Sequence, residues 1–256
     1  MTSLPAIMVA PNGARLSKKD HPKAPMTEDE IVSCAVDCFA AGAGAIHVHI
    51  RDESGQHLLD AKAYASVVQK IRAAAPEMMI QITTEAAGRY EPIQQMQVAL
   101  DSGASHVSVS IREISKAASS ELSDFLERCR HQGIVLQWIL YDVGDAETLQ
   151  SILPQSTLRS SQLQLLFVLG KYDQVAGRPE DLHPFVEWMT SAQVSPDWAV
   201  CAFGKNEPAC LVYAASLGGK CRTGFENSLQ LSNGETARSN SEKVRDLRKK
   251  LGLPSH

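Results

Sequence analysis

Short apolar runs alternate with longer mixed segments along the whole chain. Few polar residues interrupt the apolar runs, as expected for strands that are buried on both faces of a sheet. The pattern predicts strands at Ala6–Val9, Ala45–His49, Met78–Thr83, His106–Ser110, Ile134–Leu140, Gln164–Val168, Trp198–Ala202 and Lys220–Thr223.

The segments between these runs carry signals for the start and end of helices. Thr27 and Glu30 have the spacing of a capping box before a helix at Ile31–Ala41. Asp60 can cap a second helix at Ala61–Ala75. A second capping-box sequence, Ser239 to Glu242, opens the last helix. Glycines occupy the positions where helices should end, at Gly42, Gly103, Gly133 and Gly218.

Eight strand–helix pairs in 256 residues favour a closed TIM (β/α)8 barrel. An open, doubly wound sheet is the alternative, but no GxGxxG sequence follows the first strand, so a dinucleotide site has no support. We find no linker or low-complexity stretch, and we expect one domain over residues 1–256.

The composition excludes several classes of function. The chain has 25 basic and 29 acidic residues, so no charge excess points to nucleic acid or to an anionic membrane. No apolar run approaches the roughly 20 residues that span a bilayer, and Met1–Pro5 lacks the features of a signal peptide. The six cysteines form no CxxC pair, which predicts a reduced, cytoplasmic protein.

Two histidines in one strand are the strongest chemical signal. On a strand, residues two apart point to the same face, so the side chains of His47 and His49 should project together. Burying two neutral imidazoles is unfavourable unless each has a partner. Two satisfied core histidines are the alternative. Because the pair lies at the carboxyl end of a strand, where barrels build their sites, we predict a metal centre.

Glu226, just beyond the last strand, is the predicted third ligand. In a closed barrel the eighth strand pairs with the first and the first with the second, so this carboxylate can reach the histidines. Three such ligands leave a position open for substrate, and they suit zinc first, or iron, cobalt or nickel. Arg222 needs an anion, either Glu226 or a substrate carboxylate. The alternative for Glu226 is a solvated loop carboxylate, and the alternative for Arg222 is a purely structural ion pair.

Several motifs together resemble the β-keto acid cleavage enzymes, typified by the 3-keto-5-aminohexanoate cleavage enzyme. They lie at His47–Asp52, Gln81–Thr84, Phe167–Gly170 and Gly218–Asn227, with weaker matches at Asn12–Ala14 and Asp20–Pro22. The resemblance implies a zinc-dependent TIM barrel that forms a homotetramer. It further implies acyl transfer between a β-keto acid and acetyl-CoA, which yields acetoacetate and a new acyl-CoA.

The resemblance also assigns roles to single residues. It makes His47, His49 and Glu226 the metal ligands, Arg222 the activating arginine and Thr83 a substrate-binding hydroxyl. Further substrate contacts are expected from polar residues at strand ends. These are Asn12 and Arg15 after the first strand, Ser108 on the fourth and Asn227 beyond the eighth.

The chain departs from the type enzyme at the proton-abstracting position. Asn227 stands where that enzyme has an aspartate, and an amide cannot act as a base. Glu85 shares strand parity with Gln81 and Thr83, so we predict that it points into the site and serves as the base. The alternatives are that Glu85 is a loop carboxylate or the partner of Arg89.

Two further departures bear on the substrates. Arg15 and Ile139 replace glutamates that the type enzyme uses near its cationic substrate, which predicts a neutral or anionic β-keto acid such as a β-keto dicarboxylate. Lys171 and Lys205 follow the sixth and seventh strands and could meet the phosphates of coenzyme A, or could be solvated surface residues.

Two other functions remain compatible with the same residues. A metal-dependent retro-aldolase or hydrolase would keep the three ligands and need no coenzyme A. A non-catalytic barrel that binds a ligand is a further possibility, to which Asn227 gives some weight.

Overall fold

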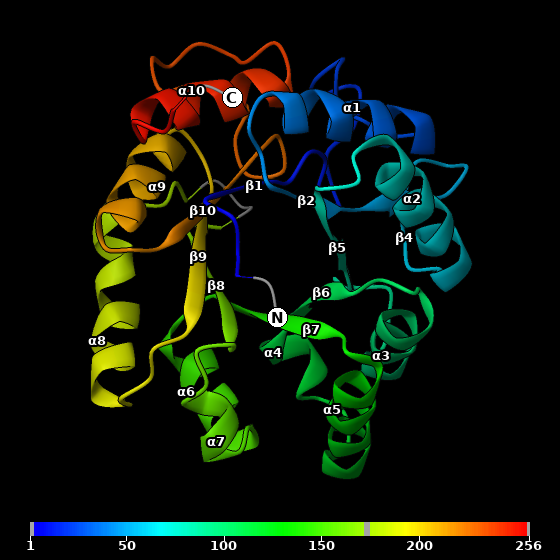
Figure 1. Ribbon diagram of the computed structural model, residues 1–256, viewed down its shortest axis with the longest axis vertical. Helices are drawn as coiled ribbons and strands as arrows, with labels where there is room; N and C mark the ends of the chain where they lie inside the picture. Colours follow the sequence, from blue (N-terminus) through cyan, green and yellow to red (C-terminus); the bar gives the residue numbers. More distant parts are fainter. Residues whose placement is uncertain (1–2, 172–174, 255–256) are drawn as a thin grey trace.

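The computed structural model describes residues 3–171 and 175–254 and forms a closed parallel barrel, so the predicted TIM barrel is confirmed (Figure 1). Around the barrel the strand order is β1-β10-β9-β8-β7-β6-β5-β2. The barrel strands are β1 (Ile7–Val9), β2 (Ala45–Val48), β5 (Met79–Thr83), β6 (His106–Ser110), β7 (Val135–Leu140), β8 (Gln164–Leu169), β9 (Asp197–Ala202) and β10 (Lys220–Thr223).

The seam of the barrel brings the last strand next to the first two. β1 pairs in parallel with β10, where Val9 faces Thr223, and with β2, where Val9 faces Ile46. This register places the end of β10 one strand away from the end of β2, as the sequence predicted. In Figure 1 the last helix lies beside the first at this seam, which covers the closure.

A small hairpin after β2 was not predicted from the sequence. β3 (Ile50–Arg51) and β4 (His57–Leu58) pair antiparallel outside the barrel. The polar stretch between them is the turn of this hairpin, in which the N–H groups of Ser54 and Gln56 both bond to the Asp52 carboxylate. The hairpin carries His57 back toward the barrel mouth.

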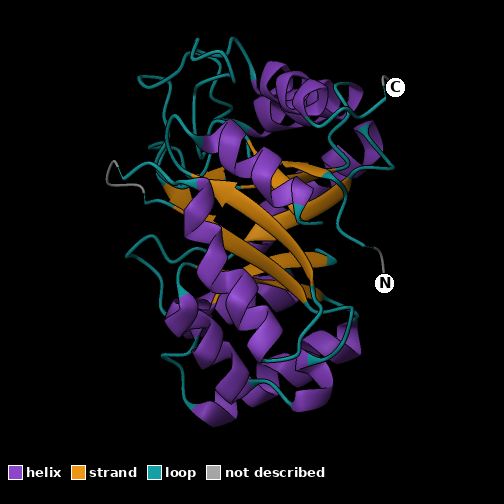
Figure 2. Cartoon of the chain, turned by 90° about the vertical axis from the view of Figure 1, so that its left-hand side faces the viewer, coloured by secondary structure: helices purple, strands orange, loops and turns teal. Residues whose placement is uncertain are grey.

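Helices surround the strands on the outside of the barrel (Figure 2). They are α1 (Glu28–Ala40), α2 (Ala61–Ala74), α3 (Pro92–Asp101), α4 (Ile111–Ile114), α5 (Ser119–Gln132), α6 (Val143–Ile152), α7 (Gln155–Leu158), the 3-10 helix η1 (Pro179–Leu182), α8 (His183–Ser191), α9 (Glu207–Ser216) and α10 (Asn240–Lys250).

Most predicted caps are present, with one correction. Thr27 and Glu30 form the reciprocal capping box at α1, and Asp60 caps α2. At α10 the Ser239 side chain accepts from the Glu242 N–H, but the Glu242 carboxylate does not return to the cap. It accepts instead from the N–H of Arg238 at 2.6 Å, one residue earlier. The second capping box is therefore only half formed.

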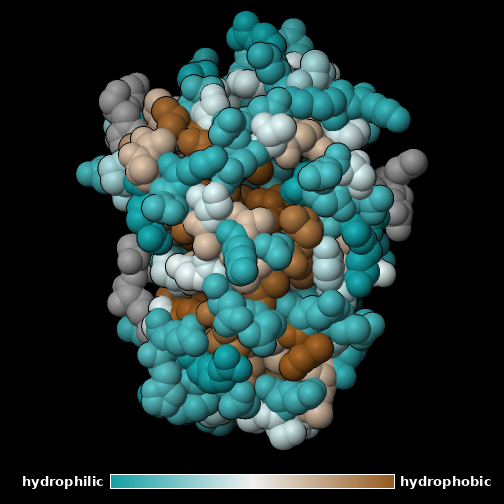
Figure 3. Space-filling view, turned by 90° about the vertical axis from the view of Figure 1, so that its right-hand side faces the viewer, coloured by the Kyte–Doolittle hydropathy of each residue, from teal (hydrophilic) through white to brown (hydrophobic). Residues whose placement is uncertain are grey.

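The core has two parts. Most buried apolar side chains fill the space between barrel and helices, and a smaller group around Met8, Leu166 and Ala199 fills the barrel interior. Five of the six cysteines are buried, and all six are free thiols, as predicted. Within the described residues no helix is long and apolar enough to cross a membrane. On the face that Figure 3 shows, apolar side chains lie in gaps between polar ones.

Candidate metal centre and active site

A small cavity of about 20 Å³ lies at the carboxyl ends of the barrel strands. One side of the cavity is polar and the other is apolar. The polar lining is His47, Thr83, Glu85, Ser110, Tyr141, Arg222 and Glu226, and the apolar lining is Ile139, Val168 and Phe203.

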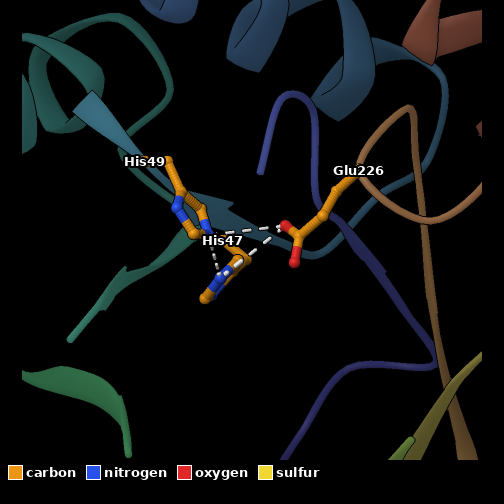
Figure 4. Close-up of side chains that lie close together, drawn as sticks. All are labelled: His47, His49 and Glu226. Carbon is orange, nitrogen blue, oxygen red and sulfur yellow. Dashed lines mark hydrogen bonds and ion pairs between the residues drawn. The ribbon is translucent and has the colours of Figure 1, made fainter. Parts of the chain in front are cut away.

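Three candidate metal ligands converge beside this cavity (Figure 4). The Nε2 atoms of His47 and His49 lie 3.0 Å apart, and Oε2 of Glu226 lies 3.8 and 3.6 Å from them. In a tetrahedral zinc site, ligand atoms about 2.1 Å from the ion are about 3.4 Å from one another. The observed separations bracket that value, so one divalent ion fits between the three side chains.

Both imidazoles are held in the neutral form that binds metals. His47 and His49 are buried, and this burial lowers the pKa of each well below its usual value. The positive charge of Arg222 lowers the pKa of His47 further. Because a metal competes with protons for the ring nitrogens, these shifts favour metal binding at neutral pH.

The loops after β1 and β10 hold Glu226 in place. Gly13 has a φ of +57°, and a Cβ atom there would lie 2.5 Å from the Cγ of Glu226. Asn240, at the start of α10, accepts a hydrogen bond from the N–H of Phe225 and donates one to the carbonyl of Pro11. One side chain of α10 therefore fixes both loops around Glu226.

Arg222 pairs with the same carboxylate that faces the histidines. Its guanidinium donates to Oε1 of Glu226 at 3.0 Å, and Oε2, which accepts no hydrogen bond in the described chain, turns to the imidazoles. The sequence suggested two anions for Arg222, Glu226 and a substrate carboxylate, and the structure shows the pair with Glu226. The guanidinium of Arg222 donates a second hydrogen bond to Sγ of Cys201. Burial raises the pKa of this thiol to about 11, so it stays protonated.

Glu85 lines the same cavity as His47 and Glu226. Burial raises its pKa, and the negative charges of Glu226 and Glu113 raise it further, to about 7, against the opposing charges of Arg15 and Arg222. A carboxyl group that titrates near neutral pH in a cleft is a candidate acid or base.

The backbone around Glu85 is held by its neighbours. Its N–H donates to Oγ1 of Thr83 at 3.0 Å, and its carbonyl accepts from Nε2 of His57 at 2.9 Å. Arg89, considered as a partner for Glu85, pairs with Asp52 at 3.7 Å. Because the Thr83 oxygen accepts this bond, its hydroxyl proton can still be donated to another group.

Two predicted contacts lie away from the cavity lining. Asn12 is buried, and its amide donates to the carbonyls of Pro25 and His49, so it supports the backbone of a candidate ligand. Ser108 is buried deeper in the barrel, and Ser110 rather than Ser108 reaches the cavity. Both serines share one strand parity, which fixes the face but not the depth.

The other two predicted substrate contacts, Arg15 and Asn227, lie at the edge of the site. Arg15 is exposed, yet close enough for its charge to lower the pKa of Glu85. Asn227 lines a neighbouring cavity of about 240 Å³ with Lys171 and Gly204, and this cavity shares Phe203 and Glu226 with the first. Lys205 is exposed.

Sequence reasoning missed Tyr141 and His57. Tyr141 is the first residue after β7 and shares parity with Ile139, so strand position alone could have indicated it. The guanidinium of Arg112 lies 4.4 Å from its ring centroid and fixes the ring. His57 gave no signal, because its place near His49, with ring centroids 5.1 Å apart, depends on the hairpin.

The chain is similar in sequence to known enzymes that act on keto acids. The 3-keto-5-aminohexanoate cleavage enzyme of Acetoanaerobium sticklandii is 26% identical over 253 residues, covering 94% of this chain and 90% of that protein. The 3-oxoadipate:acetyl-CoA acetyltransferase of Cupriavidus necator is 24% identical over 257 residues, covering 95% and 87%.

Among solved structures, the ternary complex of ObcA with C4-CoA adduct and oxalate has a TM-score of 0.73 at 18% identity. The match covers 90% of this chain but only 64% of ObcA, and at this identity it shows a shared fold. The sequence model of the beta-keto acid cleavage enzyme family matches residues 6–252, nearly the whole chain. The resemblance inferred from the sequence is confirmed: the chain belongs to the β-keto acid cleavage enzyme family, and it is an enzyme.

Proposed function

We propose that this enzyme exchanges acyl groups between a β-keto acid and acetyl-CoA at a divalent metal centre. In this reaction, a β-keto acid (R–CO–CH2–COO⁻) and acetyl-CoA are converted to acetoacetate and R–CO–CoA. The observation that carries the proposal is the convergence of His47, His49 and Glu226 on one point beside a cavity. Names of relatives that include acetyl-CoA transferases on keto acids support the choice of co-substrate.

Zinc is the preferred metal because two imidazoles and one carboxylate suit it, with iron, cobalt and nickel as alternatives. When bound, the ion polarises the keto group of the substrate as a Lewis acid. The residues of the chain bind and orient the acid around it. Arg222, although paired with Glu226, faces the cavity and can bind the substrate carboxylate, and Thr83 can donate a hydrogen bond to it.

Glu85 is proposed as the base that removes a proton from the carbon between keto and carboxylate groups. It lines the cavity with the metal ligands, and its raised pKa makes it a stronger base than an ordinary carboxylate. This assignment gives the reaction a base although Asn227 carries only an amide. Tyr141 and Ser110 add hydroxyl groups to the lining of the cavity.

The apolar wall of the cavity indicates the class of substrate. Ile139, Val168 and Phe203 offer no carboxylate to an ammonium group. Arg15 lies near enough to affect Glu85 and adds positive charge at the rim. We therefore propose a neutral or anionic acyl group, such as that of a β-keto dicarboxylate.

Acetyl-CoA is proposed to enter through the neighbouring cavity. Lys171 lies at this cavity and can meet a phosphate. Both amide atoms of Asn227 are buried without a partner in the described chain, so they can bind a polar group of either substrate. Lys205, exposed after β9, is a second candidate for a phosphate contact.

The test is incubation of the zinc-loaded enzyme with acetyl-CoA and three β-keto acids. Their acyl groups carry a second carboxylate, no charge, or an ammonium group. Mass spectrometry should show acetoacetate and the matching acyl-CoA, and a chelator should stop both. Consumption without acetyl-CoA would point to a retro-aldolase or hydrolase. Stabilisation by the acid without turnover would point to a binding barrel, and a clear preference for the amino compound would overturn the substrate class.

A homotetramer in the cytoplasm is the proposed state of the enzyme. The resemblance to the family suggests the tetramer, and six free thiols suit a reducing compartment. Light scattering coupled to size-exclusion chromatography measures the assembly directly, and a mass near that of one 27.8 kDa chain would contradict the tetramer.

A further inference from the structure

Two buried glutamines connect the ligand His47 to the far side of the barrel. The Nδ1 atom of His47 lies 2.8 Å from Oε1 of Gln81 on β5. The amide of Gln81 donates to Oε1 of Gln137 on β7 at 2.9 Å. The amide of Gln137 in turn donates to the carbonyl of Leu165 on β8 at 3.3 Å. Both glutamines are buried, with 1% of their surface exposed.

The direction of this relay is fixed at its far end. The backbone carbonyl of Leu165 can only accept, so the Gln137 amide must turn its NH2 group toward it. Its oxygen then faces Gln81, which must present NH2 to Gln137 and its own oxygen to His47. Turning either amide over would place two acceptors, or two donors, against each other inside the barrel. The orientation of both amides therefore follows from the chemistry of their partners.

The consequence reaches the ligand atom of His47. Because Gln81 offers an acceptor, the Nδ1 atom of the neutral ring carries the proton. The lone pair then belongs to Nε2, which is the atom that faces Nε2 of His49 and Oε2 of Glu226. An imidazole with its proton on Nε2 would have to lose it or turn before it could bind an ion at that point.

We infer that Gln137 is a positioning residue which, through Gln81, sets the tautomer of His47 for metal binding. This inference rests on the metal centre of the proposed function, but not on the reaction. Gln137 itself touches neither the imidazole nor the candidate ligand atoms. The surroundings support the role, because much of the barrel interior is filled by apolar side chains such as Met8, Leu166 and Ala199. A polar chain through an apolar interior is unfavourable unless every group in it is bonded.

The test compares three full-length variants with the wild-type protein. Gln137→Met removes the acceptor for Gln81 at similar side-chain volume, so the Gln81 amide is free to turn. Gln137→Glu keeps an acceptor and, when protonated, also a donor for the Leu165 carbonyl. Gln95→Met is the matched control: Gln95 is equally buried, and its amide donates to the Thr84 carbonyl and to Glu113, outside the relay.

Two readouts are needed. The first is the dissociation constant for Zn²⁺, measured by competition with a chelator. Gln137→Met should weaken binding by about 10- to 100-fold, the usual effect of losing a group that orients a ligand, while Gln137→Glu and Gln95→Met should stay within about threefold of wild type. Equal weakening in Gln137→Met and Gln95→Met would reduce the effect to lost stability and overturn the inference.

The second readout is the ¹⁵N NMR signature of His47 in the metal-free protein, assigned with a His47→Gln variant. We expect the proton on Nδ1 in the wild type and in Gln137→Glu, and a shift toward the Nε2 form in Gln137→Met. A wild-type ring protonated on Nε2 would overturn the inference outright. Since this measurement involves no keto acid and no acetyl-CoA, it can succeed when the proposed reaction fails, and the reverse.

Discussion

At the scale of single residues, Glu226 is the side chain on which the site depends most. One oxygen accepts from Arg222 and the other faces both imidazoles. Glu226→Gln keeps the shape of the side chain but removes the negative charge that faces both the metal ion and the Arg222 guanidinium. We expect zinc affinity to fall by at least about 100-fold and turnover to be lost, measured by chelator competition and by acetoacetate formation. Wild-type affinity in this variant would contradict its role as a ligand.

Glu85 should affect turnover and leave the metal in place. In Glu85→Gln the amide cannot take a proton, so we expect kcat to fall by about 100- to 10,000-fold, the usual contribution of a general base. Zinc content, measured by plasma mass spectrometry, should equal that of the wild type. Loss of zinc together with activity would show that Glu85 acts on the metal site instead. Full activity would exclude Glu85 as the base.

The pH dependence follows from the raised pKa of Glu85. The base is active only when ionised, so kcat/KM should rise with pH through an inflection at or below about 7, because a bound cation favours the carboxylate. The folded protein also keeps this proton longer than the unfolded chain does, so ionisation lowers stability as pH rises from about 4.5 to about 7. Urea titrations should therefore show Glu85→Gln gaining stability over the wild type between pH 5 and pH 8. An unchanged difference across that range would place the titration elsewhere.

At the scale of elements, a buried ion pair joins α10 to α9, and a hydrogen bond to the same carboxylate connects both helices to β10. Lys243 of α10 bonds to Glu207 at the start of α9, and Glu207 accepts from the hydroxyl of Thr223 at 2.9 Å. Lys243→Met would leave the Glu207 carboxylate buried without its cation. We expect a loss of about 3–5 kcal/mol in the free energy of unfolding. The double variant with Glu207→Met removes both charges and should recover much of it, as chemical denaturation can show.

The same elements show how far sequence reasoning reached. Apolar runs fixed the barrel strands to within a residue or two, since burial on both faces leaves a continuous signal. The hairpin β3–β4 gave none, because two-residue strands such as Ile50–Arg51 are too short for any period. Parity placed Glu85 on the correct face, but Ser110 rather than Ser108 lines the cavity. Depth along a strand depends on barrel tilt and stagger, which a linear pattern does not contain.

At the scale of the whole molecule, a metal ion would join strands on both sides of the barrel seam. His47 is on β2 and His49 directly follows it, Glu226 follows β10, and β1 lies between these strands. An ion that binds only the closed barrel stabilises it by mass action, by about 2.7 kcal/mol at a free concentration of 100 times its dissociation constant. For a chain of this size that corresponds to a rise in Tm of about 5–10 °C.

Differential scanning calorimetry with and without Zn²⁺ measures this rise, with Glu226→Gln as the control that should show little of it. Ions of the alkaline earths should have a much smaller effect, because they prefer oxygen ligands to imidazole. Zinc that raised the Tm of both proteins equally would be bound elsewhere, for example at exposed histidines such as His131. Zinc that raised neither would mean that the three side chains do not hold an ion. A rise specific to the wild type connects the ligand geometry at the seam to the stability of the entire barrel.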